Sequence, residues 1–554
     1  MAPPLLVVGL DGACLDLLRP WLDAGVLPEL ARVLREGLWA PLRSTVPAAT
    51  FPAWTSLVTG VNPGRHGVLD FTERVPGTYH VRFVNGSRRR TEAFWSRLAR
   101  AGRRVAVVTV PATYPPEALP GGMMVSGFDT PVTAAIDGRF VAPRARWPEI
   151  REAVGRVPFA DFQEVAPGPG WHAGALASLL DGVERRTRLV EHVVVRDRPD
   201  VTMVVFGESD TVSHHFWRFH DPASPRFVAS PWGGAVRRVY EALDGALGRL
   251  RAAVGDDAVV MIVSDHGSGG AGDRAVYPNR MLESAGWLRF RRGGGGGAFL
   301  RQAALRAVPF RWQAALLRRL GGTAGRLEGR ARFGRIDWAH TLAYSDELDY
   351  HPNVCLNLRG REPLGRVEPH DYTVVRERVA AALRAWRDAD GAPVVERVWR
   401  REDVYEGPAT AQAPDLMLEL ALVNGYSASV LRSPGPGPAL RRLGPEAFGA
   451  GKGAGMNGAH RRDGLVAIAG GDVPARGELS RRNIVDVAPT VLALAGAAVP
   501  RGLDGRAIAE ALGEPPSWDD AVMPVERPLY FDADEATAIA DRLRALGYLE
   551  SERS

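Results

Sequence analysis

This chain of 554 residues contains very little lysine and cysteine and has no long apolar run. Lys452 is the only lysine, so almost every basic side chain is an arginine, which stays charged at all pH values near neutrality. Because 69 basic residues are balanced by 64 acidic ones, the net charge is only +5. No block of like charges indicates a nucleic-acid surface, and we expect no nucleic-acid partner.

The two cysteines, Cys14 and Cys355, are too few for a disulfide framework, and both lie in apolar runs typical of buried thiols. No stretch reaches the roughly 20 apolar residues of a membrane span. Residues 1–10 contain neither a basic n-region nor a cleavage site. We therefore expect a soluble cytoplasmic protein, and its oligomeric state stays open.

Short apolar runs recur along a chain whose composition, 45% hydrophobic and 24% charged, is that of a globular protein. We interpret each run as a buried parallel strand. Helical patterns lie between them and predict an α/β fold, a doubly wound and mostly parallel sheet with helices on both faces. The strands are expected at 5–10, 105–110, 201–206, 258–263 and 465–469, and the helices at 28–36, 95–103 and 237–254.

The middle of the chain has a different character. Five glycines at 293–297 open a basic, helix-patterned stretch at 297–320, which we interpret as a solvated surface insertion, with membrane-surface contact as the alternative. A mixed α/β pattern follows over 336–443, including a helical pattern at 372–387. We predict a catalytic core formed by 1–292 and 444–554, with 293–443 as an insertion that covers the active site.

Three aspartates, Asp11, Asp210 and Asp265, lie at or just beyond the C-terminal ends of predicted strands, where parallel sheets bind ligands. Histidines accompany them: His214 follows Asp210 by one helical turn, and His266 follows Asp265 directly. With His460, further along the chain, these donors suit zinc, or manganese or iron as alternatives. Two metals about 4 Å apart can hold the attacking and leaving oxygens of a phosphoryl transfer.

Each motif also has a structural interpretation. Asp11-Gly12 is a common turn, and an Asp265–His266 pair at a strand end is often only hydrogen-bonded. Thr50, before Phe51-Pro52, has the sequence context of a helix N-cap. The order and placement of the motifs together favour catalysis.

That order resembles the alkaline phosphatase superfamily, in particular its type I phosphodiesterase/nucleotide pyrophosphatase branch. The segment Thr45–Asp70, with its Thr-Phe-Pro triplet, is similar to the family's nucleophile segment. Asp210-x-x-x-His214 and Ser264-Asp265-His266-Gly267 resemble its metal motifs, and Gly458-Ala459-His460 resembles the segment of its last histidine. Asn483–Pro500 is similar to the superfamily's C-terminal helix.

The resemblance implies two divalent metal ions and a threonine nucleophile. Thr50 would attack phosphorus, and water would hydrolyse the resulting phospho-threonine. Phe51, beside the nucleophile, would flank the substrate. The first metal would be held by Asp210, His214 and His460, and the second by Asp11, Asp265, His266 and the Thr50 oxygen.

The sequence departs from nucleotide pyrophosphatases at two places. Phe71 stands where they have an asparagine, and Ala53-Trp54 replaces their Asn-His. The chain looks closer to a prokaryotic group of predicted phosphohydrolases or phosphomutases. We expect hydrolysis of small-molecule phosphate esters, diesters first; the alternatives are a phosphomonoesterase, a phosphomutase, or a catalytically silent binding protein with this fold.

Lys452 is the last candidate. It lies in a glycine-rich loop shortly before His460, and we consider it a ligand for a substrate phosphate, with a solvated loop lysine as the alternative. A sulfatase is excluded because Thr50 cannot be oxidised to formylglycine.

Overall fold

The computed structural model describes residues 3–130, 138–155, 170–291, 333–347, 351–449, 455–474 and 476–520. The basic stretch at 297–320 and Lys452 lie outside these residues, so the predictions about them are not addressed by the structure. None of the described helices is both long enough and apolar enough to cross a membrane.

A ten-stranded sheet forms the centre of the described chain, in the order β19-β2-β18-β9-β1-β8-β5-β6-β7, with β20 paired to β2. The pairs of β1 with β8 and β9, and of β5 with β8, are parallel, as predicted. Strand β6, which was not predicted from the sequence, also pairs with β5 in parallel. The strands are β1 (Leu5–Leu10), β2 (Leu38–Arg43), β5 (Val105–Val110), β6 (Met123–Ser126), β7 (Val141–Ala142), β8 (Val201–Phe206), β9 (Val259–Val263), β18 (Asp463–Ala469), β19 (Gly477–Glu478) and β20 (Arg482–Asn483).

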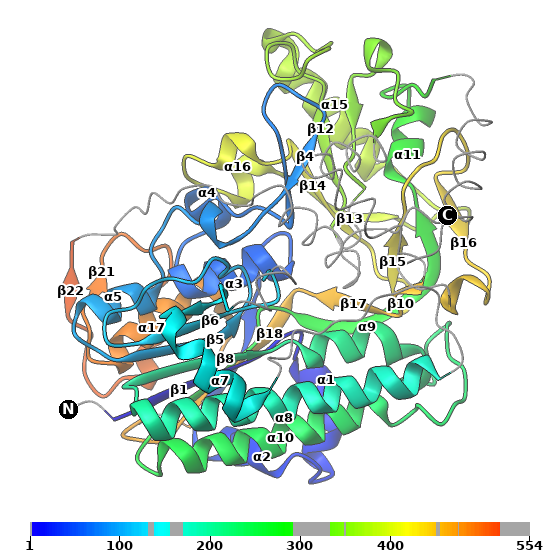
Figure 1. The fold of residues 1–554 in the computed structure, drawn as a ribbon. Helices are drawn as coiled ribbons and strands as arrows, with labels where there is room; N and C mark the ends of the chain where they lie inside the picture. The colour runs from blue at the N-terminus through cyan, green and yellow to red at the C-terminus, as the bar shows by residue number, and fades with distance from the viewer. Residues whose placement is uncertain are drawn as a thin grey trace.

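Helices cover both faces of this sheet, as Figure 1 shows. Successive side chains of a strand point to opposite faces, and β1 accordingly sends Leu6 and Val8 into one core and Leu5 and Val7 into the other. The first core includes α1 (Leu15–Asp23), α2 (Pro28–Glu36), α8 (Trp171–Asp197), α9 (Glu208–His220) and α10 (Ala235–Val254), and the second α3 (Thr50–Thr59), α5 (Phe94–Arg100) and α17 (Val487–Leu494).

One strand direction was predicted wrongly. The run at 465–469 forms part of β18, which is antiparallel to both β9 and β2. A strand buried on both faces is apolar throughout whichever way it runs, so its composition carries no directional signal. The fold class is confirmed all the same, because the pairs at the centre of the sheet are parallel.

A second body, which we call the cap, stands above the sheet in Figure 1. It has its own apolar core, built around an antiparallel sheet of order β11-β12-β14-β13. Strand β10 leads from the main sheet toward it and pairs with β15, β16 and β17. The elements are β10 (Gly267–Val276), α11 (Pro278–Ser284), β11 (Ala343–Tyr344), β12 (Asn353–Leu356), α15 (Tyr372–Arg384), β13 (Val395–Arg400), α16 (Arg401–Val404), β14 (Leu416–Leu420), β15 (Ser427–Val430), β16 (Leu440–Arg442) and β17 (Gly458–Arg461).

A short hairpin of the core, β3 (Thr72–Arg74) with β4 (Val81–Phe83), reaches up to the cap. Val81 and Tyr79 pack against the cap's apolar core, so the hairpin joins the two bodies. The remaining described α-helices and strands are α4 (Pro63–His66), α7 (Trp147–Val154), β21 (Val499–Pro500) and β22 (Trp518–Asp519).

Candidate functional site

The three aspartates lie at one edge of the sheet because their strands are neighbours. Strand β1 lies between β8 and β9, and all three run parallel. Asp11 follows β1, Asp210 lies in the first turn of α9 after β8, and Asp265 follows β9. Their side chains therefore meet where the carboxyl ends of the strands meet.

The three histidines arrive from α9, from the start of β10 and from β17. His214 lies one turn after Asp210 on α9, as the spacing predicted. His266 directly precedes β10, and β17 pairs with β10 so that His460 lies opposite Ser268. All six side chains are buried, none being more than 8% exposed.

The ligand atoms fall into two groups. The oxygens and nitrogens of Asp210, His266 and His460 lie within 4.8 Å of one another, as do those of Asp11, Asp265 and His266. His214 Nε2 lies 3.2 Å from Asp210 Oδ2 and 3.1 Å from His460 Nε2. The structure thus brings all six predicted side chains together, with His266 between the two groups, its ring stacked on that of His460 at 3.7 Å between centroids.

Backbone carbonyls orient the three imidazole rings. The Nδ1 atoms of His214, His266 and His460 lie 3.0, 3.1 and 2.8 Å from the carbonyl oxygens of Gly458, Gly267 and Ala48. A carbonyl oxygen can only accept, so each Nδ1–H donates, and in the neutral ring Nε2 carries the lone pair. This is the arrangement in which histidine binds metals.

Polar atoms without hydrogen-bond partners are a second reason why these side chains fit divalent cations. Asp11 Oδ1, Asp210 Oδ1, Asp265 Oδ2 and His266 Nε2 are buried and have no hydrogen-bond partner within the described part of the chain. A buried carboxylate oxygen without a partner is costly, and cation coordination removes that cost. The same residues would hold the metal ions that the sequence predicts.

Burial and mutual repulsion control the ionisation of this cluster. Burial, with the charge of Asp210 as a further cause, raises the pKa of Asp11 and of Asp265 well above the usual value. Burial opposes the ionisation of Asp210 as well, but His214 outweighs it and brings the pKa of that carboxyl below its usual value. Burial also lowers the pKa of His266 to about 4, so this ring is neutral at pH 7.

Thr50 is the first residue of α3, with Ala49 rather than Thr50 in the N-cap position. It is fully buried. Two contacts tie the start of this helix to the cluster: Trp54 Nε1 donates to Asp11 Oδ2 at 3.0 Å, and Ala48 O accepts from His460 Nδ1 at 2.8 Å. Thr50 therefore lies on a segment held from both sides by candidate metal ligands.

Phe51 is fully buried in a small apolar cluster. Its ring centroid lies 4.5 Å from that of Phe71 and 5.3 Å from that of Phe128. Phe71, noted above as a departure from the family pattern, thus packs against the residue next to Thr50. A contact between Phe51 and substrate stays a prediction.

Several supporting residues were not singled out from the sequence. Trp54 was noted only as a departure from the family pattern, although its indole holds Asp11. Ser209 donates to Asp11 O at 2.6 Å, and Ser268 donates to Gly12 O at 2.7 Å. The spacing of the motifs gives no signal for such contacts, because they join side chains to distant backbone.

Comparisons with known proteins identify the family of this chain. The family model described as type I phosphodiesterase / nucleotide pyrophosphatase matches residues 5–429. Ectonucleotide pyrophosphatase/phosphodiesterase family member 1 of Homo sapiens is 36% identical over 69 residues, which are 12% of this chain and 7% of that protein. The protein of the same name from Rattus norvegicus is 36% identical over 70 residues, 12% of this chain and 8% of its own length. This chain therefore spans less than a tenth of the curated relatives that it matches.

A solved structure shares the fold. Phosphonoacetate hydrolase from Sinorhizobium meliloti, in complex with phosphonoformate, superposes with a TM-score of 0.52 at 16% identity, covering 88% of this chain and 94% of that one. At this identity the match supports the alkaline phosphatase-like fold alone. The family model, which spans most of the chain, confirms the predicted family. The chain belongs to the type I phosphodiesterase / nucleotide pyrophosphatase family, whose members are hydrolases acting on phosphoester bonds.

Proposed function

We propose that this chain is a metal-dependent phosphohydrolase that cleaves phosphate esters, phosphodiesters first, with Thr50 as the nucleophile. The observation that carries the proposal is that three buried aspartates and three buried histidines meet beside a helix that begins at Thr50. Three carboxylates and three imidazoles suit zinc, and manganese or iron are the alternatives.

In the proposed reaction, Thr50 Oγ1 replaces the leaving oxygen on phosphorus, and water then replaces Thr50 Oγ1. One water is added across one P–O bond, so the leaving alcohol gains the proton that the water loses. Bound divalent cations would acidify the threonine hydroxyl and neutralise charge on the phosphate oxygens. Trp54 holds Asp11 in place, and the Nδ1–H groups fix the rings with Nε2 inward.

The test compares turnover of bis-(p-nitrophenyl) phosphate and p-nitrophenyl phosphate by protein of known metal content. We expect Thr50→Ala to keep its metal and to lose turnover by at least about a thousandfold. Thr59→Ala is the matched control: Thr59 is buried at the far end of the same helix and donates to Thr55 O at 2.7 Å. Unchanged turnover by Thr50→Ala would contradict the proposal.

The same assay separates the alternatives. Faster turnover of the monoester would favour a phosphomonoesterase. Turnover of neither ester by metal-loaded protein would favour a phosphomutase of narrow specificity or a silent binding protein.

A further inference from the structure

A cavity of about 410 Å³ lies between the β3–β4 hairpin and the cap. Its volume falls within the roughly 300–1,000 Å³ of small-molecule sites. Pro47, the hairpin and the residues on both sides of the hairpin form one wall, and the cap forms the other. None of the seven predicted metal and nucleophile residues lines this cavity, so it is a separate feature of the molecule.

The cavity adjoins the candidate metal centre through Ala48. Pro47 and His351 line the cavity. Ala48, next to Pro47, donates from its backbone N–H to His351 Nε2 at 3.1 Å, while its carbonyl accepts from His460 Nδ1 at 2.8 Å. One residue, Ala48, thus separates the cavity wall from a candidate metal ligand, and Thr50 follows two residues later.

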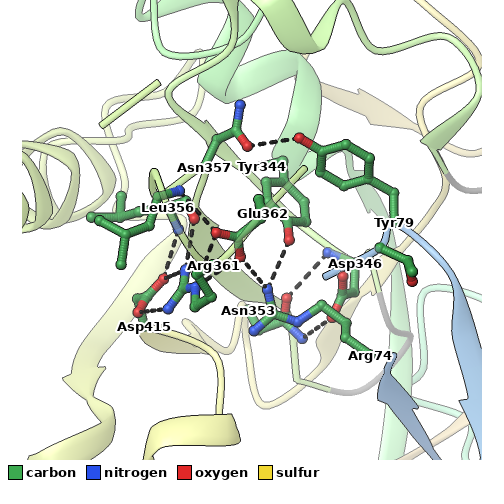
Figure 2. A network of polar contacts seen from close by, with 12 residues as sticks. Arg74, Tyr79, Tyr344, Asp346, Asn353, Leu356, Asn357, Arg361, Glu362 and Asp415 are labelled. Carbon is green, nitrogen blue, oxygen red and sulfur yellow. Dashed lines mark hydrogen bonds and ion pairs between the residues drawn. The ribbon is translucent and has the colours of Figure 1, made fainter. Parts of the chain in front are cut away.

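An ion pair and hydrogen bonds hold the hairpin against the cap. Arg74, on the hairpin, donates to Tyr344 Oη at 2.7 Å and to Glu362 at 3.2 Å, and both partners belong to the cap (Figure 2). Arg361 donates to the fully buried Asp415 at 2.6 and 2.8 Å. A second hairpin contact, from Tyr79 Oη to Asn357 at 2.9 Å, is also visible in Figure 2. The cavity is therefore preformed.

Internal partners occupy most of the polar groups in the walls. Of the five lining arginines, Arg82 and Arg88 pair with Glu73, Arg74 pairs with Glu362, and Arg361 pairs with Asp415. The remaining lining carboxylates also accept hydrogen bonds, Asp70 from Phe71 N and Asp346 from Asn353 Nδ2. One carboxylate oxygen of these walls, Asp346 Oδ1, is buried without a hydrogen-bond partner in the described part of the chain.

Two hydrogen-bond donors in the cavity walls remain available to a ligand. Within the described chain Arg90 has no acidic partner, and its side chain donates only to Gln412 Oε1, at 3.2 Å. His351 Nε2 accepts from Ala48 N, so a neutral ring must carry its proton on Nδ1. Burial lowers the pKa of His351 to about 3, which keeps the ring neutral at pH 7. The cavity thus offers a guanidinium and an imidazole N–H.

We propose that this cavity binds the organic group esterified to the reacting phosphate and selects a group that carries a second anion, a carboxylate or phosphate, held by Arg90 and His351. The proposal rests on the proposed function, because the cavity needs a reacting phosphate beside it. An arginine without a carboxylate partner binds such anions through paired N–H groups.

Three diesters that share a p-nitrophenyl leaving group test this specificity: the second ester group is phenyl, 4-carboxyphenyl or 4-phosphonooxyphenyl. We expect wild-type protein to prefer the anionic esters in kcat/KM by about 10- to 100-fold, the range of a charged hydrogen bond. The better of the two anionic esters identifies the anion. Arg90→Gln should remove most of the preference, measured as the ratio of kcat/KM on each anionic ester to kcat/KM on the phenyl ester.

Two further variants complete the experiment. His351→Gln, which can still accept from Ala48 N, should raise KM for the anionic esters more than it lowers kcat. Arg384→Gln, an exposed arginine of α15 in the cap, should change nothing. Equal rates on the three esters, or a preference that survives Arg90→Gln and His351→Gln, would overturn the inference while the proposed function stands. Failure to hydrolyse any of the esters would instead count against the proposed function.

Discussion

At the scale of single residues, Trp54 is the side chain most directly tied to a candidate metal ligand. Trp54→Phe removes the indole N–H that donates to Asp11 Oδ2 and keeps most of the buried ring. Because partners that orient metal ligands contribute to affinity, we expect metal binding to weaken by about 10- to 100-fold. Competition with a metal chelator measures this change.

Trp95→Phe is the matched control. Trp95 is equally buried, and its Nε1 donates to Glu117 Oε1 at 2.8 Å, away from the metal centre. We expect this variant to lose stability without losing metal affinity. Equal metal affinity in Trp54→Phe and wild type would show that Asp11 needs no indole partner.

The sequence predicts the candidate metal ligands better than it predicts the residues that hold those ligands in place. Asp11, Asp210 and Asp265 could be placed together because each follows a strand that is recognisable from its apolar run. Trp54 could not be linked to Asp11, because that bond depends on how α3 packs over the end of β1. Phe51 shows the same limit: its burial against Phe71 depends on the packing of two distant segments.

At the scale of elements, the approach of β17 to α9 positions two of the histidines. A Cβ atom at Gly458 would lie 2.5 Å from Ser213 O, and Gly458 O accepts from His214 Nδ1. Gly458→Ala must therefore push the strand away from the helix. We expect a loss of about 1–3 kcal/mol in the free energy of unfolding and weaker metal binding, because His460 moves with β17.

Gly245→Ala on α10 provides the comparison. A Cβ atom at Gly245 meets no atom within 4 Å, and the position is exposed. We expect a gain of about 0.5–1 kcal/mol from the better helix propensity, with unchanged metal affinity. Denaturant unfolding and metal titration of both variants test the pair, and unaltered metal affinity in Gly458→Ala would rule out the positioning role of this contact.

Element boundaries were predictable to within a few residues, but strand direction was not. The helix at 28–36 is found at the predicted residues, while the one predicted at 95–103 ends at Arg100. The direction of β18 depends on the path of the chain through the cap, and the local sequence carries no information about that path.

At the scale of the whole molecule, Glu347 makes stability depend on pH. This buried side chain accepts from Asn279 N at 2.9 Å and from Ser433 N at 2.6 Å. Burial raises its pKa from 4.5 to about 7. The native state therefore keeps a proton that the unfolded chain releases, and stability falls as the pH rises from about 4.5 to about 7.

Glu347→Gln removes the titrating group and keeps a neutral side chain of the same shape. As the pH rises from about 4.5 to about 7, we expect the free energy of unfolding of the wild type to fall by up to roughly 3 kcal/mol more than that of this variant. Urea unfolding at a series of pH values measures the difference, with Glu396→Gln on the exposed face of β13 as the control. A pH profile of Glu347→Gln that matches the wild type would refute the prediction.

The most direct test of the proposed mechanism is the stereochemical course at phosphorus. A phosphorothioate diester that is chiral at phosphorus, hydrolysed in oxygen-18 water, reports whether one displacement or two take place. Attack by Thr50 followed by attack by water inverts the phosphorus centre twice, so the account predicts overall retention of configuration. Overall inversion would mean that water attacks the diester directly, and Thr50 would then not be the nucleophile.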